Sequence, residues 1–304
     1  MNKGILYIIL SGLSFLIVNF FIKLFGGHHT LGFLPPVQRI PAHELVLARS
    51  VISFVISFYI IKRRKLPLFG VNKKWLWIRG TSGMIALTMF FMTIAHLPLA
   101  IASTIQYLAP VFTVLFSIWI LKEKVLKIQW LFILIALVGV GFIGLNNFFA
   151  AENESLKIDY FWLIIGIVSA IFSGLAYTSI LKLKATDKPI NIVIYFPMIS
   201  LPIMSFWCLF DFVLPQGIEW LFLFIIGIFT QIAQVLLTKA FHEGDASTIA
   251  PFQYLGSIYA FLVGYFIFFE KLSPFVELGI AFILGGIILN AISKKFKRNR
   301  NLGG

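Results

Sequence analysis

The chain has 304 residues, of which 60% are hydrophobic and 12% are charged, and its mean hydropathy is +0.96. Soluble domains carry roughly 25% charged residues because their surface faces water, so this composition excludes a soluble protein and indicates a polytopic membrane protein. The net charge of +13 could suggest a nucleic acid partner. However, the basic residues lie in short gaps between apolar blocks, which favours a role in membrane orientation and predicts no nucleic acid partner. A single cysteine, Cys208, excludes an intramolecular disulfide and any multi-cysteine metal site.

Long apolar stretches follow one another along the whole chain. A helix needs about 20 apolar residues to cross a bilayer, and by this rule the sequence predicts an all-α polytopic membrane protein with ten transmembrane helices. The first stretch, from Gly4 to Leu24, has no small-residue cleavage site close behind it, so we expect a retained span and no removable signal peptide. The longest connection, from Phe25 to Ala42, is expected along the outer surface. The predicted spans are residues 4–24, 43–61, 74–95, 99–121, 128–147, 159–181, 190–213, 218–240, 246–269 and 272–293.

Basic residues are distributed unevenly between the two sides of the predicted bundle. If the N-terminus is cytoplasmic, 19 of the 25 Lys and Arg residues lie in connections or tails on the cytoplasmic side, and 4 lie on the outer side. The remaining two, Arg49 and Arg79, lie inside spans or at their edges. Cytoplasmic connections carry an excess of Lys and Arg. We therefore predict a multi-pass protein of the cell (cytoplasmic or inner) membrane with both termini in the cytoplasm.

An internal repeat relates the two halves of the chain. The segment that begins at Gln106 reads QYLAPVFTVLFSIWILKEK, and the segment that begins at Gln253 reads QYLGSIYAFLVGYFIFFEK. Chance similarity between two apolar segments is disfavoured because the polar Gln-Tyr and Glu-Lys pairs also match. The offset of 147 residues predicts two five-helix repeats, residues 1–150 and residues 151–304, the second with a basic cytoplasmic tail. Because five is odd, the second repeat is expected to be inverted, as in many secondary transporters, whose site lies at the repeat interface.

Several short motifs mark the ends and interiors of the spans. They are Ala-Ser-Thr at 102–104 and 246–248, Pro110, Glu123, Glu270, the glycine-rich fifth and tenth spans, and Arg49 after His43-Glu44-Leu45. Together they resemble the EamA-like family of the drug/metabolite transporter superfamily over essentially the whole chain. The second half departs from the first in having Ser257 where the first has Pro110. The resemblance implies a ten-helix carrier for small organic metabolites, in a superfamily that includes amino-acid exporters, importers of S-adenosylmethionine and riboflavin, and sugar-nucleotide carriers.

Polar side chains recur at helical spacing in five of the predicted spans. Such residues are costly in a bilayer and tend to face the bundle or an aqueous cavity. Small hydroxyl residues also mediate helix packing, and for Ser and Thr we favour that interpretation. The bulkier amide and tyrosine side chains favour the lining of a central, substrate-binding cavity built from spans one, three, four, six, eight and nine. Together with Arg49, the predicted substrate-binding residues are Asn19, Gln106, Tyr107, Tyr177, Gln231, Gln234, Gln253 and Tyr254.

Charged residues are few inside the predicted spans. Arg49, about a turn and a half into span two, could hold an anionic group of the substrate or a carboxylate from another span. An equally supported alternative is that Arg49 is a structural residue whose side chain extends to the interface or pairs with Glu44. Arg79 and Lys239 lie near cytoplasmic span ends and are predicted to be interfacial. No Asp or Glu lies in the middle of a span, so we predict facilitated transport or exchange in preference to obligatory proton symport.

Two motif matches give no cofactor or metal site. Residues 139–144, GVGFIG, fit a dinucleotide-binding fingerprint, but they lie within an apolar span with no strand before them, so we interpret them as a close-packing glycine face. His28, His29 and His43 lack regular ligand spacing. Because no nucleophile–base constellation is found either, we predict no cofactor, no metal site and no catalytic residue, and therefore no enzyme. A channel is disfavoured because the helices carry no charged ring or filter sequence.

The sequence thus predicts a secondary transporter that moves a small organic metabolite by alternating access. Its predicted partners are this small-molecule substrate and the lipid bilayer, and the oligomeric state stays open. An amino acid or amino-acid derivative is the first substrate hypothesis. S-adenosylmethionine or another nucleoside-like metabolite is the alternative, favoured by the aromatic content and by likeness to that branch at Lys23 and Arg49.

Overall fold

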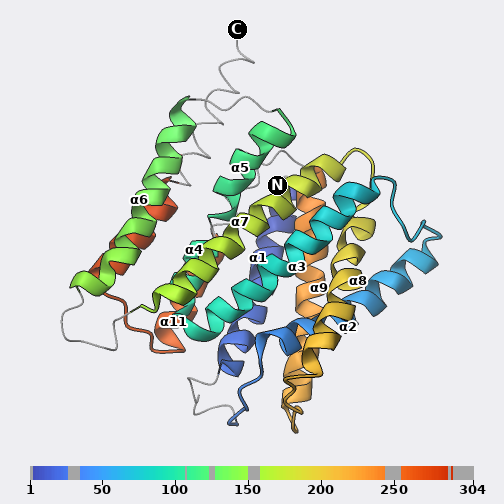
Figure 1. Ribbon diagram of the computed structural model, residues 1–304, viewed down its shortest axis with the longest axis horizontal. Helices are drawn as coiled ribbons and strands as arrows, with labels where there is room; N and C mark the ends of the chain where they lie inside the picture. Colours follow the sequence, from blue (N-terminus) through green and yellow to red (C-terminus); the bar gives the residue numbers. More distant parts are fainter. Residues whose placement is uncertain are drawn as a thin grey trace.

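The architecture is helical throughout the part of the chain that the structure describes. The computed structural model describes residues 3–26, 35–106, 108–122, 127–149, 158–243, 255–286 and 289, and none of these residues lies in a strand (Figure 1). Seven helices among them are long and apolar enough to cross a membrane, judged by length and composition. The all-α prediction is therefore confirmed for these residues. The count of ten spans stays a prediction, because parts of the ninth and tenth predicted spans lie outside the described residues.

The helices follow the first eight predicted spans, with one clear difference at the seventh. That span was expected to reach residue 213, but its helix, α8, ends at Cys208. The residues that follow are bound to the start of α2 instead: His43 Nε2 lies 2.7 Å from the Asp211 carbonyl oxygen, and Val213 N donates to Glu44 Oε2 at 3.0 Å. The helices are α1 (Lys3–Phe25), α2 (Ala42–Arg63), α3 (Lys73–His96), α4 (Leu99–Gln106), α5 (Ala109–Ile120), α6 (Lys127–Phe149), α7 (Tyr160–Leu183), α8 (Pro189–Cys208), α9 (Glu219–Glu243) and α11 (Leu255–Phe266), followed by a shorter apolar helix, Pro274–Gly286.

The described helix of the fourth predicted span has two parts, on either side of Tyr107, which lies outside the described residues. The first part, α4, ends at Gln106, and the second part, α5, begins at Ala109. Pro110 occupies the first turn of α5. A proline has no backbone N–H, so Pro110 cannot donate to the carbonyl one turn earlier, and its ring disfavours a continuous helix there. Membrane helices tolerate proline where other protein groups surround them.

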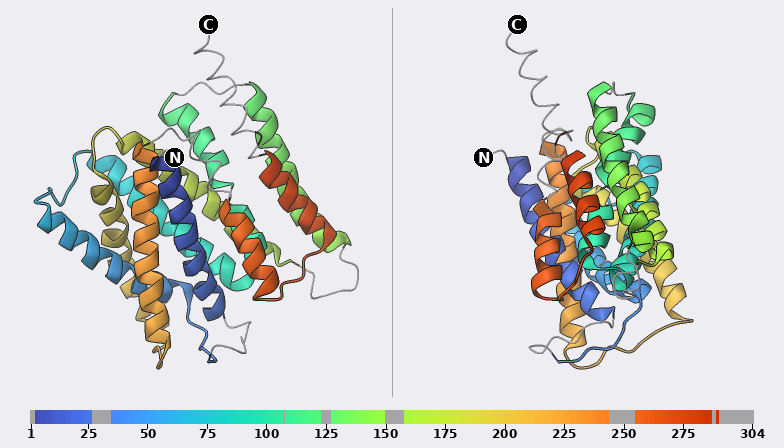
Figure 2. Two further views of the ribbon diagram at one scale, coloured as in Figure 1. Left: turned by 180° about the vertical axis from the view of Figure 1, so that it is seen from behind. Right: turned by 90° about the vertical axis from the view of Figure 1, so that its left-hand side faces the viewer.

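The long helices pack in pairs. The α3 helix runs along α7, α1 runs along α9, and α2 packs against α8 and α9. Figure 1 shows α2 and α8 on one flank of the molecule and α6 on the other, with α1, α3, α7 and α9 between them. The helix Pro274–Gly286 lies beside α6 (Figure 2). There a Cβ added at Gly139 would overlap the backbone oxygen of Gly279, so this glycine permits the close approach of two helices.

Large apolar side chains cover much of the outer surface as well as the interior. Trp119, Leu209 and Phe210 are 80%, 79% and 76% exposed. Water-soluble monomers rarely present wide apolar surfaces of this kind. A surface of this kind suits lipid, in agreement with the composition.

Candidate functional site

A cavity of about 120 Å³ lies between the long helices. Its walls come from α1, α3, α4, α5, α7, α8 and α9, and they combine aromatic rings with a limited set of polar groups. Mostly apolar walls with a few converging polar groups are typical of small-molecule sites. The aromatic residues in the lining are Phe15, Phe90, Phe91, Tyr177 and Phe196, and the other polar or charged residues are Ser11, Asn19, Arg79, Ser103, Gln106, Ser173 and Gln234.

Arg79 provides the positive charge of the lining. Its side chain is 3% exposed, and Nη2 donates to Gln234 Oε1 at 3.0 Å, which joins α3 to α9. Gly83 lies one turn further along α3 and also lines the cavity. A Cβ at Gly83 would overlap Nη1 of Arg79. The glycine therefore leaves the space that the guanidinium occupies. The sequence-based prediction that Arg79 is interfacial is wrong, since this residue is buried in the cavity wall.

Gln106, the last residue of α4, is held against α7. Its Nε2 donates to Ser173 Oγ at 2.7 Å, and its Oε1 lies 3.0 Å from Ser169 Oγ. An amide fixed in this way presents a defined edge to the cavity.

Three buried polar atoms in the cavity wall have no hydrogen-bond partner among the described residues. They are Asn19 Oδ1, Ser103 Oγ and Arg79 Nε. A buried polar atom without a partner is costly, and most such atoms in proteins are paired. One acceptor, one hydroxyl and one cationic donor without partners therefore belong to residues that line the same cavity.

Arg49 is equally buried but does not line the cavity. Its side chain is 1% exposed, and its Cζ lies 4.2 Å from the centroid of the Phe196 ring, which is itself part of the cavity wall. The Nε and Nη1 atoms have no hydrogen-bond partner in the described chain. Phe196 thus contacts one buried cation, Arg49, and lines the same cavity as another, Arg79.

Gln231 faces α2 rather than the cavity. Its Nε2 donates to Ser57 Oγ at 2.8 Å, and its Oε1 accepts from Ser53 Oγ. The side chain is 3% exposed. Both ends of the amide are therefore used in packing α9 on α2, as expected for polar contacts between membrane helices.

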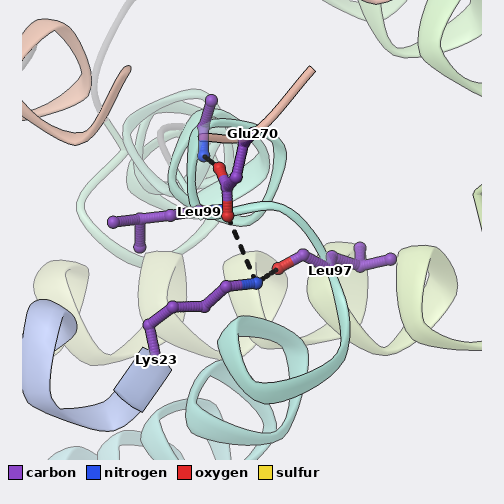
Figure 3. Close-up of polar contacts among 5 residues, drawn as sticks. Lys23, Leu97, Leu99 and Glu270 are labelled. Carbon is purple, nitrogen blue, oxygen red and sulfur yellow. Dashed lines mark hydrogen bonds and ion pairs between the residues drawn. The ribbon is translucent and has the colours of Figure 1, made fainter. Parts of the chain in front are cut away.

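A buried ion pair lies one helical turn beyond Asn19. Lys23 Nζ is 3.3 Å from Glu270 Oε1 and donates to the Leu97 carbonyl oxygen at 2.6 Å (Figure 3). Glu270 Oε1 also accepts from Leu99 N at 2.7 Å, at the start of α4. The two side chains are 5% and 6% exposed. This cluster joins α1, the connection between α3 and α4, and the segment after α11, at the end of the bundle that the basic residues predict to be outside.

The structure separates the predicted substrate-binding residues into three groups. Asn19, Gln106, Tyr177 and Gln234 line one cavity. Arg49 and Gln231 lie elsewhere in the bundle, and their binding role stays a prediction. Tyr107, Gln253 and Tyr254 lie outside the described residues. Phe196 of α8 also lines the cavity. This helix corresponds to the seventh predicted span, which was not among the spans predicted to build the cavity.

Arg79 lines the cavity although we predicted an interfacial position, and two features of the sequence indicate its position inside the bundle. Trp75 and Trp77 precede it by four and two residues, and Trp77 is 53% exposed. Tryptophans mark the membrane–water interface, so an arginine after them lies deeper than the interface. Glycine one turn later, at Gly83, is the second signal, because it gives a long side chain room inside the bundle.

Comparison with known proteins identifies the family. The model of the EamA-like transporter family matches residues 2–145 and again residues 160–292. The chain belongs to the EamA-like transporter family. The resemblance expected from the sequence is thereby confirmed, and the protein is a membrane transporter of the drug/metabolite type and not an enzyme.

Individual relatives are transporters of small metabolites. A pseudopaline exporter of Pseudomonas aeruginosa is 28% identical over 265 residues, which are 85% of each chain. An S-adenosylmethionine uptake transporter of Rickettsia prowazekii is 26% identical over 195 residues, 64% of this chain and 63% of the relative. Human solute carrier family 35 member G1 is 25% identical over 303 residues, 96% of this chain and 80% of the relative. A solved crystal structure shares the fold, with a TM-score of 0.67, 16% identity, and coverage of 96% of this chain and 98% of that one.

Proposed function

We propose that this EamA-like protein is a secondary transporter that carries an amino acid or amino-acid derivative across the cytoplasmic membrane by alternating access. The observation that carries the proposal is the cavity, in whose wall Asn19, Ser103 and Arg79 each present a buried polar atom without a partner. These groups come from α1, α4 and α3. The proposal includes the predicted orientation, with both termini in the cytoplasm.

The packing of the helices supports two inverted five-helix repeats. In such an arrangement α1 and α3 of the first half correspond to α7 and α9 of the second. The pairs α1–α9 and α3–α7 are then the same contact made twice, and both pairs pack closely. The two separate matches of the family model, residues 2–145 and 160–292, agree with the same division. Inverted repeats place the substrate at their interface and move one unit against the other.

Alternating access requires, at each end of the cavity, contacts that shut it off from one side of the membrane and that can separate. We assign the outer closure to Lys23 and Glu270, because their contact joins α1 of the first half to the segment after α11 in the second half. Glu270 also accepts from Leu99 N, so the start of α4 is bound to the same carboxylate. Opening of the cavity toward the outside then requires the loss of one ion pair and of the two hydrogen bonds that Leu99 N and Ala100 N donate to Glu270.

The aromatic part of the lining favours the second substrate hypothesis. Phe15, Phe90, Phe91 and Phe196 face the cavity together with Tyr177. Flat rings of this kind can stack on a nucleobase or hold a sulfonium or ammonium cation. S-adenosylmethionine carries an adenine, a sulfonium and an amino-acid group, and it is our alternative substrate.

Counterflow in proteoliposomes tests the proposed function. Vesicles that contain the purified protein are loaded with an unlabelled compound and offered a trace of the same compound with a label, for a panel of amino acids and for S-adenosylmethionine. A carrier gives transient accumulation of the label of its substrate. Flux that rises linearly with concentration without saturation would contradict a carrier and favour a channel.

A further inference from the structure

The cavity wall has an unbalanced charge. Among its described residues it contains one cation, Arg79, and neither Asp nor Glu. The guanidinium donates to the neutral amide of Gln234, at 3.0 Å. Arg49, behind Phe196, adds a second cation that is likewise without a carboxylate in the described chain. Burial of an ion without an opposite charge is expensive, so this part of the bundle lacks a negative charge.

The free hydrogen-bonding positions of Arg79 point to the kind of group that supplies this charge. Nη2 is used by Gln234, whereas Nε has no partner in the described chain although it is buried. An arginine side chain presents a planar fork of donors that fits the two oxygens of a carboxylate. Gly83 leaves the space that Nη1 of this guanidinium occupies, so the glycine keeps the arginine in its place in the cavity wall.

We propose that Arg79 binds the carboxylate of the transported molecule, so that the substrate carries a carboxylate and is not an amine or an amide that lacks one. This inference rests on the proposed function and specifies its substrate. Asn19 Oδ1, an acceptor without a partner in the same wall, is free to receive a hydrogen bond from an ammonium or amide N–H of the same molecule. Arg49 is a positioning residue: it supports Phe196 by a cation–π contact and adds positive potential without touching the substrate.

The test measures the melting temperature of the purified full-length protein in lipid nanodiscs with matched pairs of compounds. The pairs are L-methionine with L-methioninamide, L-leucine with L-leucinamide, and S-adenosylmethionine with its decarboxylated form. We expect at least one acid to raise the melting temperature more than its counterpart without a carboxylate, with an apparent affinity roughly tenfold or more higher. If no acid of the panel is preferred over its counterpart in the wild-type protein, the inference is wrong.

Two variants separate a binding arginine from a structural one. Arg79→Gln is expected to abolish the preference for the acid, whereas Lys239→Gln, which removes one exposed charge outside the cavity wall, is expected to retain it. Without ligand, Arg79→Gln is expected to melt no lower than the wild type, because it removes a buried cation that lacks a counter-charge. A preference for the acid that persists in Arg79→Gln would overturn the inference.

The outcome of this binding test can be distinguished from the outcome of the transport assay. Counterflow of a substrate combined with equal binding of acid and amide would retain the carrier and overturn the carboxylate inference. Binding that prefers the acid and requires Arg79, without counterflow of any compound, would retain the carboxylate site and contradict the proposed transport.

Discussion

Lys23 Nζ lies 3.3 Å from Glu270 Oε1, so a residue near the end of the first helix pairs with one in the last part of the chain. The same two side chains bind the backbone on either side of the turn between α3 and α4, at Leu97 O and Leu99 N. One ion pair thus connects three parts of the bundle at one end. This arrangement gives the pair a role in stability and in the opening of the cavity, and the two roles can be measured separately.

Removal of one member of the pair is expected to destabilise the protein strongly. Because both side chains are nearly inaccessible, Lys23→Met leaves the Glu270 carboxylate buried without its cation, a loss of about 3–5 kcal/mol in comparable pairs. The double variant Lys23→Met/Glu270→Gln is expected to recover part of this loss, which appears as a coupling energy in a double-mutant cycle. The free energy of unfolding in detergent gives the measurement. If the loss of unfolding free energy in the double variant equals the sum of the losses in the two single variants, the two charges do not interact.

Weakening of the pair is also expected to favour the outward-open state. Asn19 lies in the cavity one turn below Lys23, so a cysteine at position 19 reports access from outside. In a Cys208→Ser background, Asn19→Cys is expected to react faster with a membrane-impermeant thiol reagent when Glu270→Gln is added. The Leu214→Cys variant, at an exposed position of the connection between α8 and α9 on the same predicted outer side, serves as the control for a general change in reactivity. Equal acceleration at both positions, or none at position 19, would contradict the assignment of the pair as the outer closure.

Replacement of Gly83 by a residue with a side chain is expected to impair transport. Its Cβ would overlap Nη1 of Arg79, the end of a flexible side chain, so Gly83→Ala is expected to displace the guanidinium while the melting temperature changes little. Gly12→Ala is the matched control, because Gly12 lines the same cavity and its Cβ would meet no atom within 4 Å. Initial counterflow rates are expected to fall at least tenfold in Gly83→Ala and much less in Gly12→Ala. Equal rates in the two variants would show that the position of Arg79 is unimportant.

Transport is expected to continue without a proton gradient. The described lining of the cavity contains no carboxylate that could relay a proton. Counterflow is therefore expected at the same rate with and without a protonophore, at equal pH on both sides of the vesicle membrane. A rate that collapses when the pH gradient is removed would establish proton coupling and contradict this expectation.

The sequence predicted the helices better than the faces that they present. Stretches of apolar residues identify spans because the bilayer sets their length. The direction in which a side chain points depends on the rotation of each helix about its axis, which neighbours determine. Gln231 and Gln234 illustrate this: three residues apart on α9, they differ by about 60° in direction, and one binds Ser57 on α2 while the other contacts Arg79.

Contacts between residues that are far apart along the chain could not be predicted from the sequence either. Glu270 belongs to a recognisable motif at the end of a span, but nothing local indicates that its partner is Lys23. The depth of Arg79 could be inferred from the preceding tryptophans, whereas its contact with Gln234 could not, because that contact depends on how α3 and α9 approach each other in the folded bundle.

The most direct test of the central claim, that substrate binds in this cavity, compares Gln234→Ala with Gln231→Ala in counterflow. Both variants remove an amide from α9, but only Gln234 lines the cavity, while Gln231 binds Ser53 and Ser57 of α2. We expect Gln234→Ala to raise the concentration of substrate required for half-maximal counterflow roughly tenfold, and Gln231→Ala to lower the melting temperature while that concentration stays unchanged. An unchanged half-maximal concentration in Gln234→Ala, or a larger increase in Gln231→Ala, would contradict the assignment of this cavity as the substrate site.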